Sequence, residues 1–393
     1  MRIIRRNKRF SKLLAVMLSM ILCIQGMITG MTTASAESVK YEDGYDIATL
    51  LSRYQFATSG DVNLANGGHT VGPIAVGGSN SISNTFGDVG AFLGIPSYVN
   101  THVNGTLGNG FDSHYSDVYY ETSNGYIPDY LKDYWIQNDE YMELDKAFEH
   151  IVIPQSKDIA DNATEAEVIT NVSYQPSWSW ETGLTWIEVV EKTITIDCRG
   201  KDSMNVKINY EDYAAARYVT ILIDNPSWFQ SHLCTISIVN AGDNNVELNG
   251  GAYQKLVMAN GTGQNVTYYN LNEVFTNNLD GSQYGGQMNT NGMNLVWNLP
   301  DAKNVTFNDM GGHLVAPNAT VSVHSNYEGG IVAKNITGSA EGHFFPMTLK
   351  FGNEDKFSIP TPTPTSTPTS TPTSTPTDVP TSTPTEEPTP DVT

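Results

Sequence analysis

Three tryptophans lie close together in the segment PSWSWETGLTW, which surrounds them with Ser, Thr and Glu. Trp178 and Trp180 alternate with serines, and Trp186 closes the segment. Because indole faces stack on sugar rings and on apolar peptide, this segment is the leading candidate for a contact surface. The alternative is that the same rings pack a helix onto a sheet.

Two tyrosines, Tyr119 and Tyr120, give the segment DVYYETSNGY a similar amphipathic character, and Tyr126 ends it. The Ser, Asn and Gly residues predict an exposed loop. We therefore include Tyr119 and Tyr120 among the candidate binding residues.

Carboxylate pairs that could hydrolyse a glycosidic bond occur only as neighbours in the sequence. Among 42 acidic residues, pairs such as Asp139-Glu140 and Glu211-Asp212 are expected, and they are typical of solvated surfaces. There is no Gly-x-Ser-x-Gly elbow and no P-loop, and the eight His are scattered. We assign no catalytic residue; the alternative class is a β-helical polysaccharide lyase, a glycosidase or a carbohydrate-binding module.

Metal ligands are suggested only by turn residues. Asn109, Asp112 and Asp117, and the run Asp243-Asn244-Asn245, carry oxygen atoms that could bind Ca²⁺. Neither set fits an EF-hand or a repeated calcium nonapeptide, and Asn and Asp are ordinary turn formers. There is no CxxC or HExxH, so zinc is not indicated, and no cofactor is assigned.

The first 36 residues have the three parts of a secretory signal. A cationic start from Arg2 to Arg9 leads into an apolar stretch and then into Ala34-Ser35-Ala36, where we expect cleavage. No later segment is apolar for long enough to span a bilayer. The sequence predicts a secreted or cell-surface protein.

Removal of the signal makes the chain more acidic. The mature chain keeps 15 basic and 42 acidic residues, a net charge of −27. This charge argues against nucleic acid as a partner. Of the three cysteines, Cys198 and Cys234 remain; they either form a disulfide or stay as two buried thiols, and their spacing does not decide between these states.

Residues 360–393 consist almost entirely of Pro, Thr and Ser. Proline fixes φ and removes a hydrogen-bond donor, so an extended, disordered spacer is expected. It ends at Thr393 without a sorting motif; either the sequence is truncated or attachment is non-covalent. Residues 37–359 form one folded region.

Short apolar alternations separated by Asn, Gly and Asp turns recur at both ends of this region. They predict a mostly β fold, an irregular β-solenoid, with a β-sandwich as the alternative. Apolar residues at helical spacing predict one amphipathic helix at about 129–153, ended by Pro154, with a shorter helix following to Asn162. Strands are expected at 193–198, 206–210, 218–224 and 235–239.

With these segments laid out, the chain resembles the choice-of-anchor A domain, a family of bacterial surface proteins. The resemblance rests on FATSGDVNLANGGHTVGPIAVGGSNSIS, TISIVNAGDNNVELNG and above all VAPNATV, GGIVAKNITG and Glu341-Gly342-His343. Val71-Gly72-Pro73 replaces the family's Glu-Gly-Arg. The resemblance implies adhesion, and members are sometimes described as collagen-binding. We expect collagen or another matrix protein, or a cell-surface or plant polysaccharide, as partner. His343 and Glu341 either contact that partner or form a hydrogen bond that fixes the last turn.

The predicted solenoid is also similar to bacterial ice-binding domains. Ice binding needs threonines aligned in regular rows on a flat face. Thr193 and Thr195 are the only such pair that we expect in a strand. We therefore favour non-enzymatic adhesion or matrix binding over ice binding.

Overall fold

The computed structural model describes residues 44–65, 68–82, 101–108, 117–123, 127, 129, 132–133, 135–137, 142–225, 227–250, 256–260, 267–269, 271 and 293–360. Contacts divide the chain into two units, Met1–Ile359 and Pro360–Thr393. The expected signal and the spacer after Pro360 lie outside the described residues. The fold given below is that of the first unit.

The chain is mostly β, as predicted. The first strands are β1 (Phe56–Thr58), β2 (Val62–Leu64), β3 (His69–Thr70), β4 (Ile74–Val76), β5 (Thr101–Leu107), β6 (Val118–Ser123) and β7 (Trp135–Gln137). The middle strands are β8 (Thr164–Glu165), β9 (Glu167–Ser179), β10 (Gly183–Asp197), β11 (Ser203–Asn209), β12 (Ala216–Ile223), β13 (Leu233–Val239), β14 (Asn245–Asn249), β15 (Leu256–Asn260) and β16 (Thr267–Tyr269). The last are β17 (Leu295–Asn298), β18 (Asn304–Asn308), β19 (His313–Val323), β20 (Tyr327–Glu328), β21 (Ile331–Gly338) and β22 (Glu341–His343).

The helices are α2 (Ile47–Arg53), α4 (Leu144–Ala147), the π-helical turn η2 (Phe148–Val152), α5 (Ile153–Asp161), α6 (Tyr210–Ala215), α7 (Trp228–Ser231) and the 3₁₀ turn η4 (Glu354–Lys356). The strands predicted at 193–198, 206–210, 218–224 and 235–239 correspond to β10, β11, β12 and β13. The predictions for β11, β12 and β13 are confirmed within a few residues at each end, whereas β10 starts at Gly183, ten residues before the predicted start.

A stack of parallel strands forms the body of the fold. Its order is β7-β6-β5-β4-β1-β21-β19-β17-β13-β11-β8, and every neighbouring pair along it is parallel. Strands β2, β18 and β14 extend the same sheet over a second face. Parallel short strands that stack coil upon coil define a solenoid, so this prediction is confirmed. The sandwich alternative is wrong, because sandwiches are built from antiparallel strands.

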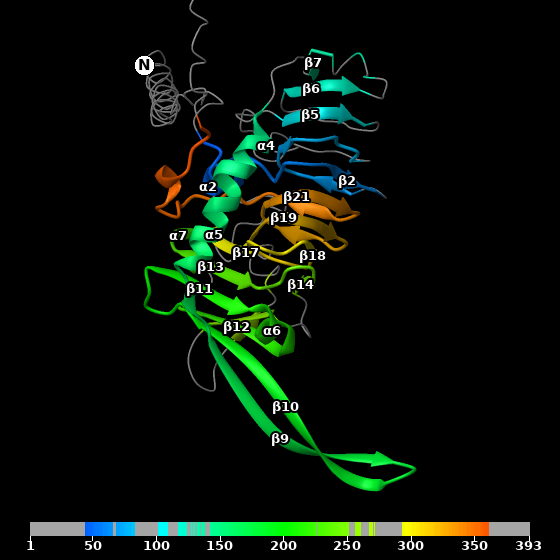
Figure 1. Ribbon diagram of the computed structural model, residues 1–393, viewed down its shortest axis with the longest axis vertical. Coiled ribbons are helices and arrows are strands. Elements are labelled where there is room, and N and C mark those ends of the chain that lie inside the picture. The colour runs from blue at the N-terminus through cyan, green and yellow to red at the C-terminus, as the bar shows by residue number, and fades with distance from the viewer. Residues whose placement is uncertain are drawn as a thin grey trace, which may run out of the picture. The chain divides into compact units, whose positions relative to one another are not determined.

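One helix carries the chain from one end of the stack to the other (Figure 1). The chain enters at β1, in the middle, and β4 to β7 build outward to one end. The continuous 18-residue helix α4–η2–α5 then leads to β8 at the opposite end. Strands β11, β13, β17, β19 and β21 fill the stack back to β1.

Hydrogen bonds fix both ends of this helix. Asn104 of β5 donates to the Met142 carbonyl over 2.6 Å just before the helix, and Asn205 of β11 donates to the Ile159 carbonyl over 3.0 Å. β5 and β11 are seven strand steps apart, about 33 Å at the usual strand spacing, and 18 helical residues span about 27 Å. The length of the helix therefore matches most of the stack that it crosses.

The predicted boundaries of the helix are wrong at both ends. Within the predicted span 129–153, Trp135 belongs to strand β7 and is 6% exposed, because its indole packs in the core of the last coil. Pro154 does not end the helix. The Ile153 N–H donates to the Phe148 carbonyl in the wider π turn, and the chain continues as α5 with proline in its first turn.

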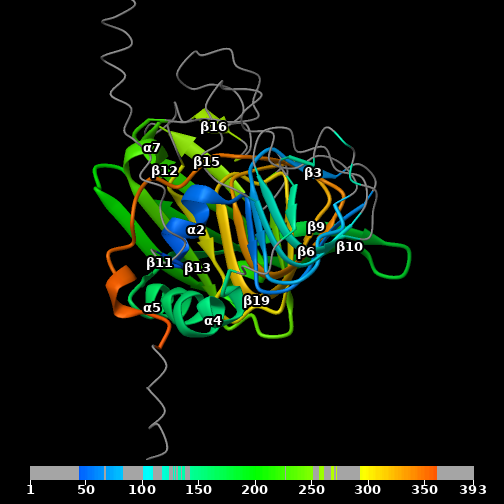
Figure 2. The ribbon, with the colours of Figure 1, turned by 90° about the horizontal axis from the view of Figure 1, so that it is seen from above.

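Two apolar layers hold the helix on the sheet. Inside the solenoid lie side chains such as Phe56, Ile331 and Trp297. On the outer face, small strand residues including Ala57 and Val332 allow the helices to approach closely; the helix residues of this layer are Ile47, Leu51, Phe148, Val152 and Ile159. Figure 2 shows α4 and α5 beside β11, β13 and β19.

A buried polar cluster joins α5 to two strands. The Ser156 hydroxyl donates to Asn298 Oδ1 over 2.6 Å, and Asn298 Nδ2 donates to the Ser156 carbonyl (2.9 Å) and to Ser237 Oγ (3.0 Å). All three side chains are fully buried. Each polar group is thus satisfied by another, as burial requires.

We predict that Asn298→Ala lowers the free energy of unfolding by about 2–4 kcal/mol, because it leaves the Ser156 and Ser237 hydroxyls buried without Asn298. Urea unfolding followed by circular dichroism measures this change. The matched control is Asn318→Ala, at an exposed asparagine that donates to the Pro300 carbonyl, and it should change stability by under about 1 kcal/mol. Equal effects of the two substitutions would contradict the prediction.

Candidate binding surface

Strands β9 and β10 form an antiparallel hairpin that we call the β9–β10 ribbon (Glu167–Asp197). They pair continuously from Glu167–Thr195 to Ser179–Gly183. Strand β12 pairs with β10 only between Lys192 and Asp197. Beyond Lys192 the two strands therefore pair only with each other, and Figure 1 shows them running on past β12.

A short turn closes the ribbon at its tip. Ser179 pairs with Gly183, so residues 180–182 form the loop, and the Ser179 hydroxyl accepts a hydrogen bond from the Thr182 N–H over 3.1 Å. Gly183 has a φ of +69°, the left-handed conformation that ends three-residue hairpin loops. The Glu-Thr-Gly sequence here is what such a turn requires.

The register gives the ribbon two different faces. Directly opposed residues point to the same side of an antiparallel pair. The apolar face carries the pairs Val172–Val190, Tyr174–Glu188, Pro176–Trp186 and Trp178–Leu184, and the polar face carries Asn171–Glu191, Ser173–Val189, Gln175–Ile187 and Ser177–Thr185.

The exposed apolar side chains of the described residues gather on this ribbon. All nine large hydrophobic residues that are exposed belong to it: Ile169, Val172, Tyr174, Trp178, Trp180, Leu184, Trp186, Ile187 and Val190. Six of them lie on the apolar face, and Trp180 is in the tip loop. These exposed apolar side chains make the ribbon the candidate binding surface of the described part of the chain.

The three predicted tryptophans are at this tip. Trp178, Trp180 and Trp186 are 56%, 93% and 66% exposed. The rings of Trp178 and Trp180 contact each other edge to face, with centroids 4.5 Å apart. The alternative that these rings pack a helix onto a sheet is therefore wrong, because all three are more than half exposed.

The sequence interpretation missed the rest of the apolar face. Val172, Tyr174, Leu184 and Val190 continue it toward the base of the ribbon. The Tyr174 hydroxyl donates to Glu188 Oε2 over 3.0 Å, which engages the one carboxylate on this face. Period-two alternation on both sides of the Glu-Thr-Gly turn is the signal that could have identified these residues.

The two predicted tyrosines are in a different place. They lie on β6 and not in an exposed loop, which corrects that expectation. Tyr120 is buried in the core, and Tyr119 is half-buried and stacks on His102 with ring centroids 5.1 Å apart. Strand β6 belongs to the large sheet and β10 to the five-stranded sheet, so the structure does not join the tyrosines to the tryptophans. Tyr126 lies outside the described residues.

The two cysteines face each other across the core. Cys198 follows β10, Cys234 belongs to β13, and their Sγ atoms are 3.8 Å apart and fully buried. They are unbonded thiols in this structure. The hydrogen bond to Cys198, together with burial, raises the pKa of the Cys234 thiol well above its usual value. The disulfide stays a prediction.

Ranks of small polar residues, which we call the polar ladder, lie on the face formed by β14, β18, β19, β21 and β2. One rank is Asn245, Asn304, Thr320 and Asn335, and the other is Glu247, Thr306, Ser322, Thr337 and Asn63. Neighbours in a rank bond to each other, as in Ser322 Oγ to Thr337 Oγ1 at 3.3 Å. The expectation that Thr193 and Thr195 would be the only ranked pair is wrong, because ranks form across strands.

Glu341 and His343 belong to a partly buried chain of ionisable groups. His343 Nδ1 lies 2.7 Å from Glu328 Oε1, and His343 Nε2 lies 3.3 Å from Glu341 Oε1. His69 Nε2 lies 3.0 Å from the same Glu341 atom. Burial raises the pKa of Glu328 to about 6. Although burial lowers the pKa of His343, its bond to Glu328 is decisive and leaves that pKa raised. The chain links β3, β20 and β22, so it fixes the end of the fold.

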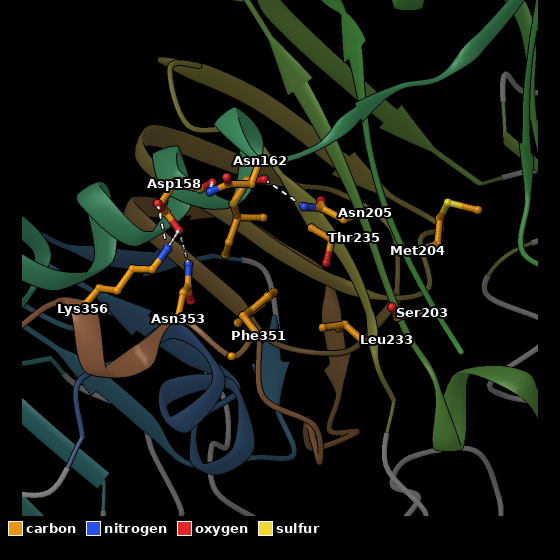
Figure 3. Close-up of a pocket in the computed structure, with 12 residues that line it drawn as sticks. Asp158, Asn162, Ser203, Met204, Asn205, Leu233, Thr235, Phe351, Asn353 and Lys356 are labelled. Carbon is orange, nitrogen blue, oxygen red and sulfur yellow. Dashed lines mark hydrogen bonds and ion pairs between the residues drawn. The ribbon is translucent and has the colours of Figure 1, made fainter. Parts of the chain in front are cut away.

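A small pocket of about 270 Å³ lies where α5 meets β11 and the C-terminal segment (Figure 3). Its carboxylate, Asp158, accepts hydrogen bonds from Asn353 (2.8 Å) and Lys356 (3.1 Å). The Asn353 bond is the main cause of the lowered pKa of Asp158. The charged groups neutralise one another and include no nucleophile with an adjacent base, so the pocket holds the C-terminal segment in place.

Several of the turn and acidic residues considered in the sequence as metal ligands or carboxylate pairs have structural partners. Asp243 pairs with Lys303 at 2.6 Å, and Asn244 donates to the Ala241 carbonyl in its own turn. Asp212 pairs with Lys192 at 2.6 Å on a half-exposed surface. Asn109, Asp112, Asp139 and Glu140 lie outside the described residues. Across the described part of the chain, no group of three His, Cys, Asp or Glu side chains could hold a metal ion.

The solenoid with its long helix and exposed ribbon is an adhesive type of domain by comparison with known proteins. Residues 47–344 match the family model described as "Putative Ice-binding-like adhesive domain" (pAdhesive_15), and the chain belongs to this family. No curated protein matches the chain. Among the described residues, no helix has the length and apolar character needed to cross a membrane.

The buried histidines predict a stability maximum near pH 6.5. Burial lowers the pKa of His102 and of His313 to about 4, so protonation of the unfolded state reduces stability as pH falls from 6.5 toward 4. His343 acts in the opposite sense: its raised pKa gives stability that is present below pH 6.5 and lost as pH rises through its folded value. Glu328 adds to this loss between pH 4.5 and about 6, but two histidines outweigh it there.

Thermal unfolding measured from pH 4 to 9 tests this expectation. His343→Gln should reduce the decline above pH 6.5. Because His343 also lowers the pKa of Glu328, the variant should in addition raise that pKa. The exposed His324→Gln is the control and should leave both limbs unchanged. A decline above pH 6.5 that persists in His343→Gln would show that another group causes it.

Proposed function

We propose that this chain is a secreted, non-enzymatic adhesion domain and that the apolar face of the β9–β10 ribbon is its contact surface. The observation that carries the proposal is that, among the described residues, all nine exposed large hydrophobic side chains gather on one ribbon. Membership of an adhesive family supports it. An aromatic, mostly uncharged face suits apolar peptide and the faces of sugar rings.

Display at the cell surface completes the proposal. Residues 1–36 would direct export, and the Pro/Thr/Ser-rich residues 360–393 would hold residues 37–359 away from the cell. The VAPNATV and GGIVAKNITG segments support choice-of-anchor A as the closer affiliation. The partner would be a matrix protein such as collagen, or a cell-surface or plant polysaccharide.

We expect Trp178→Ala/Trp186→Ala to weaken binding by at least about tenfold, because interface aromatics of this kind each contribute 1 kcal/mol or more. Surface plasmon resonance against collagens, mucins and plant polysaccharides measures the effect. Ser177→Ala/Thr185→Ala is the matched control, since this pair lies between the tryptophans on the polar face.

Circular dichroism must show that both variants fold. Native-like binding by the tryptophan variant, or equal loss in the control, would remove the ribbon from the adhesive role. Product release from any polysaccharide would contradict the non-enzymatic assignment.

The polar ladder favours ice as a second candidate ligand. Its ranks repeat about every 4.8 Å across strands and about 6.6 Å along them, and the family description includes ice-binding-like domains. If this candidate holds, the labelled protein should enter growing ice and Thr337→Arg should abolish entry, whereas Thr185→Arg on the ribbon should not. Exclusion of the native protein from ice would eliminate the candidate.

A further inference from the structure

We infer that the partner of the β9–β10 ribbon is a second copy of this chain, so that adhesion is homotypic. The inference rests on the proposed function, because it uses the same apolar face. It concerns which molecule covers that face and how two copies lie against each other.

The ribbon needs a permanent cover. Between its tip and Lys192, each strand forms strand pairs only with the other among the described residues, and the ion pair of Glu191 with Arg217 lies at the base. A two-stranded hairpin is marginally stable in water unless a further layer packs on it. Yet Val172, Tyr174, Leu184 and Trp186 are each more than half exposed. A second copy is the one partner that is present wherever the chain is secreted.

The size of the apolar face fits a dimer. Its six large hydrophobic side chains expose on the order of 700 Å², since an aromatic side chain alone can bury about 150–250 Å². A stable protein interface covers about 800 Å² on each partner. Two such faces placed together therefore make an interface of ordinary size.

The order of side chains along the face is self-complementary. Bulky Trp178, Leu184 and Trp186 lie toward the tip, and the smaller Val172 and Val190 lie toward the base. A two-fold axis across the ribbon reverses this order in the second copy. Trp178 then lies over Val172 of the other copy, and Leu184 lies over its Val190, so that large side chains meet small ones.

Charge favours the same antiparallel arrangement. The mature chain carries a net charge of −27, so two bodies placed side by side would repel. Antiparallel ribbons place the two bases, and the bodies attached to them, at opposite ends. Glu188 then faces the Pro176–Trp186 row of the other copy and not a second Glu188.

Sedimentation equilibrium of the full secreted chain tests the inference. We expect a dimer whose dissociation constant rises at least tenfold in Trp178→Ala/Trp186→Ala and is unchanged in Ser177→Ala/Thr185→Ala. A monomer at every soluble concentration, or a dimer indifferent to the tryptophans, would overturn it.

Disulfide trapping provides a second measurement that does not remove the tryptophans. Leu184→Cys/Val190→Cys should give a covalent dimer on mild oxidation, because the two positions face each other between copies. The same pair is about 20 Å apart within one strand and cannot bond internally. The control Thr185→Cys/Val189→Cys places thiols on the polar face and should stay monomeric. Equal trapping of both pairs would contradict the arrangement.

The two proposals fail separately. A monomer that binds collagen or polysaccharide through the tryptophans would overturn homotypic pairing and leave the proposed function standing. The opposite result is a chain that dimerises through the ribbon but binds no matrix ligand, and whose display does not make cells aggregate. That result would support the dimer interface and contradict the adhesive role.

Discussion

The parallel pairing of β1 with β21 is the constraint on which the rest of this fold depends. Phe56 lies beside Ile331 and Ala57 beside Val332, so the first and the last strands of the large sheet are neighbours. Because the chain starts in the middle of its own stack, it must later cross to the far end and build back. The long helix supplies that crossing and packs on β11, β13 and β19 through α5, while α2 packs on β1 and β21.

The same arrangement of strands creates two exposed surfaces, the polar ladder and the β9–β10 ribbon. On the face of β19 and β21 away from the helix, parallel pairing at a fixed register aligns polar side chains into the ladder. At the far end, β10 starts outside the body and finishes inside it. Ile194 and Ile196 are fully buried, whereas Trp186 and Val190 on the same side of the same strand are exposed. The apolar face of the ribbon thus continues the core-facing side of β10 beyond the strands that cover that side.

The base and the outer part of the ribbon differ. Its base is fixed by six paired residues of β12 and by the ion pair of Lys192 with Asp212, while its outer part exposes three tryptophans. In the proposed role, contact through the apolar face of the ribbon, on which Glu188 is the one carboxylate, would take place away from the acidic body. In the proposed display, the Pro/Thr spacer would add a second separation, between the body and its cell.

The sequence by itself determined the mostly β class, the solenoid and the tryptophan segment, because period-two alternation and turn residues are local signals. It also placed strands β11 to β13 closely, but of β10 it identified only the part that pairs with β12. It did not determine the helix boundaries. Trp135 is compatible with a strand or a helix, and only its packing in the last coil places it in β7. The π turn before Pro154 also depends on packing. Whether Trp178 is core or surface, why Tyr120 is buried, and how Thr306, Ser322 and Thr337 align are matters of long-range pairing. Only the tertiary structure decided them, because each depends on which distant strand lies alongside.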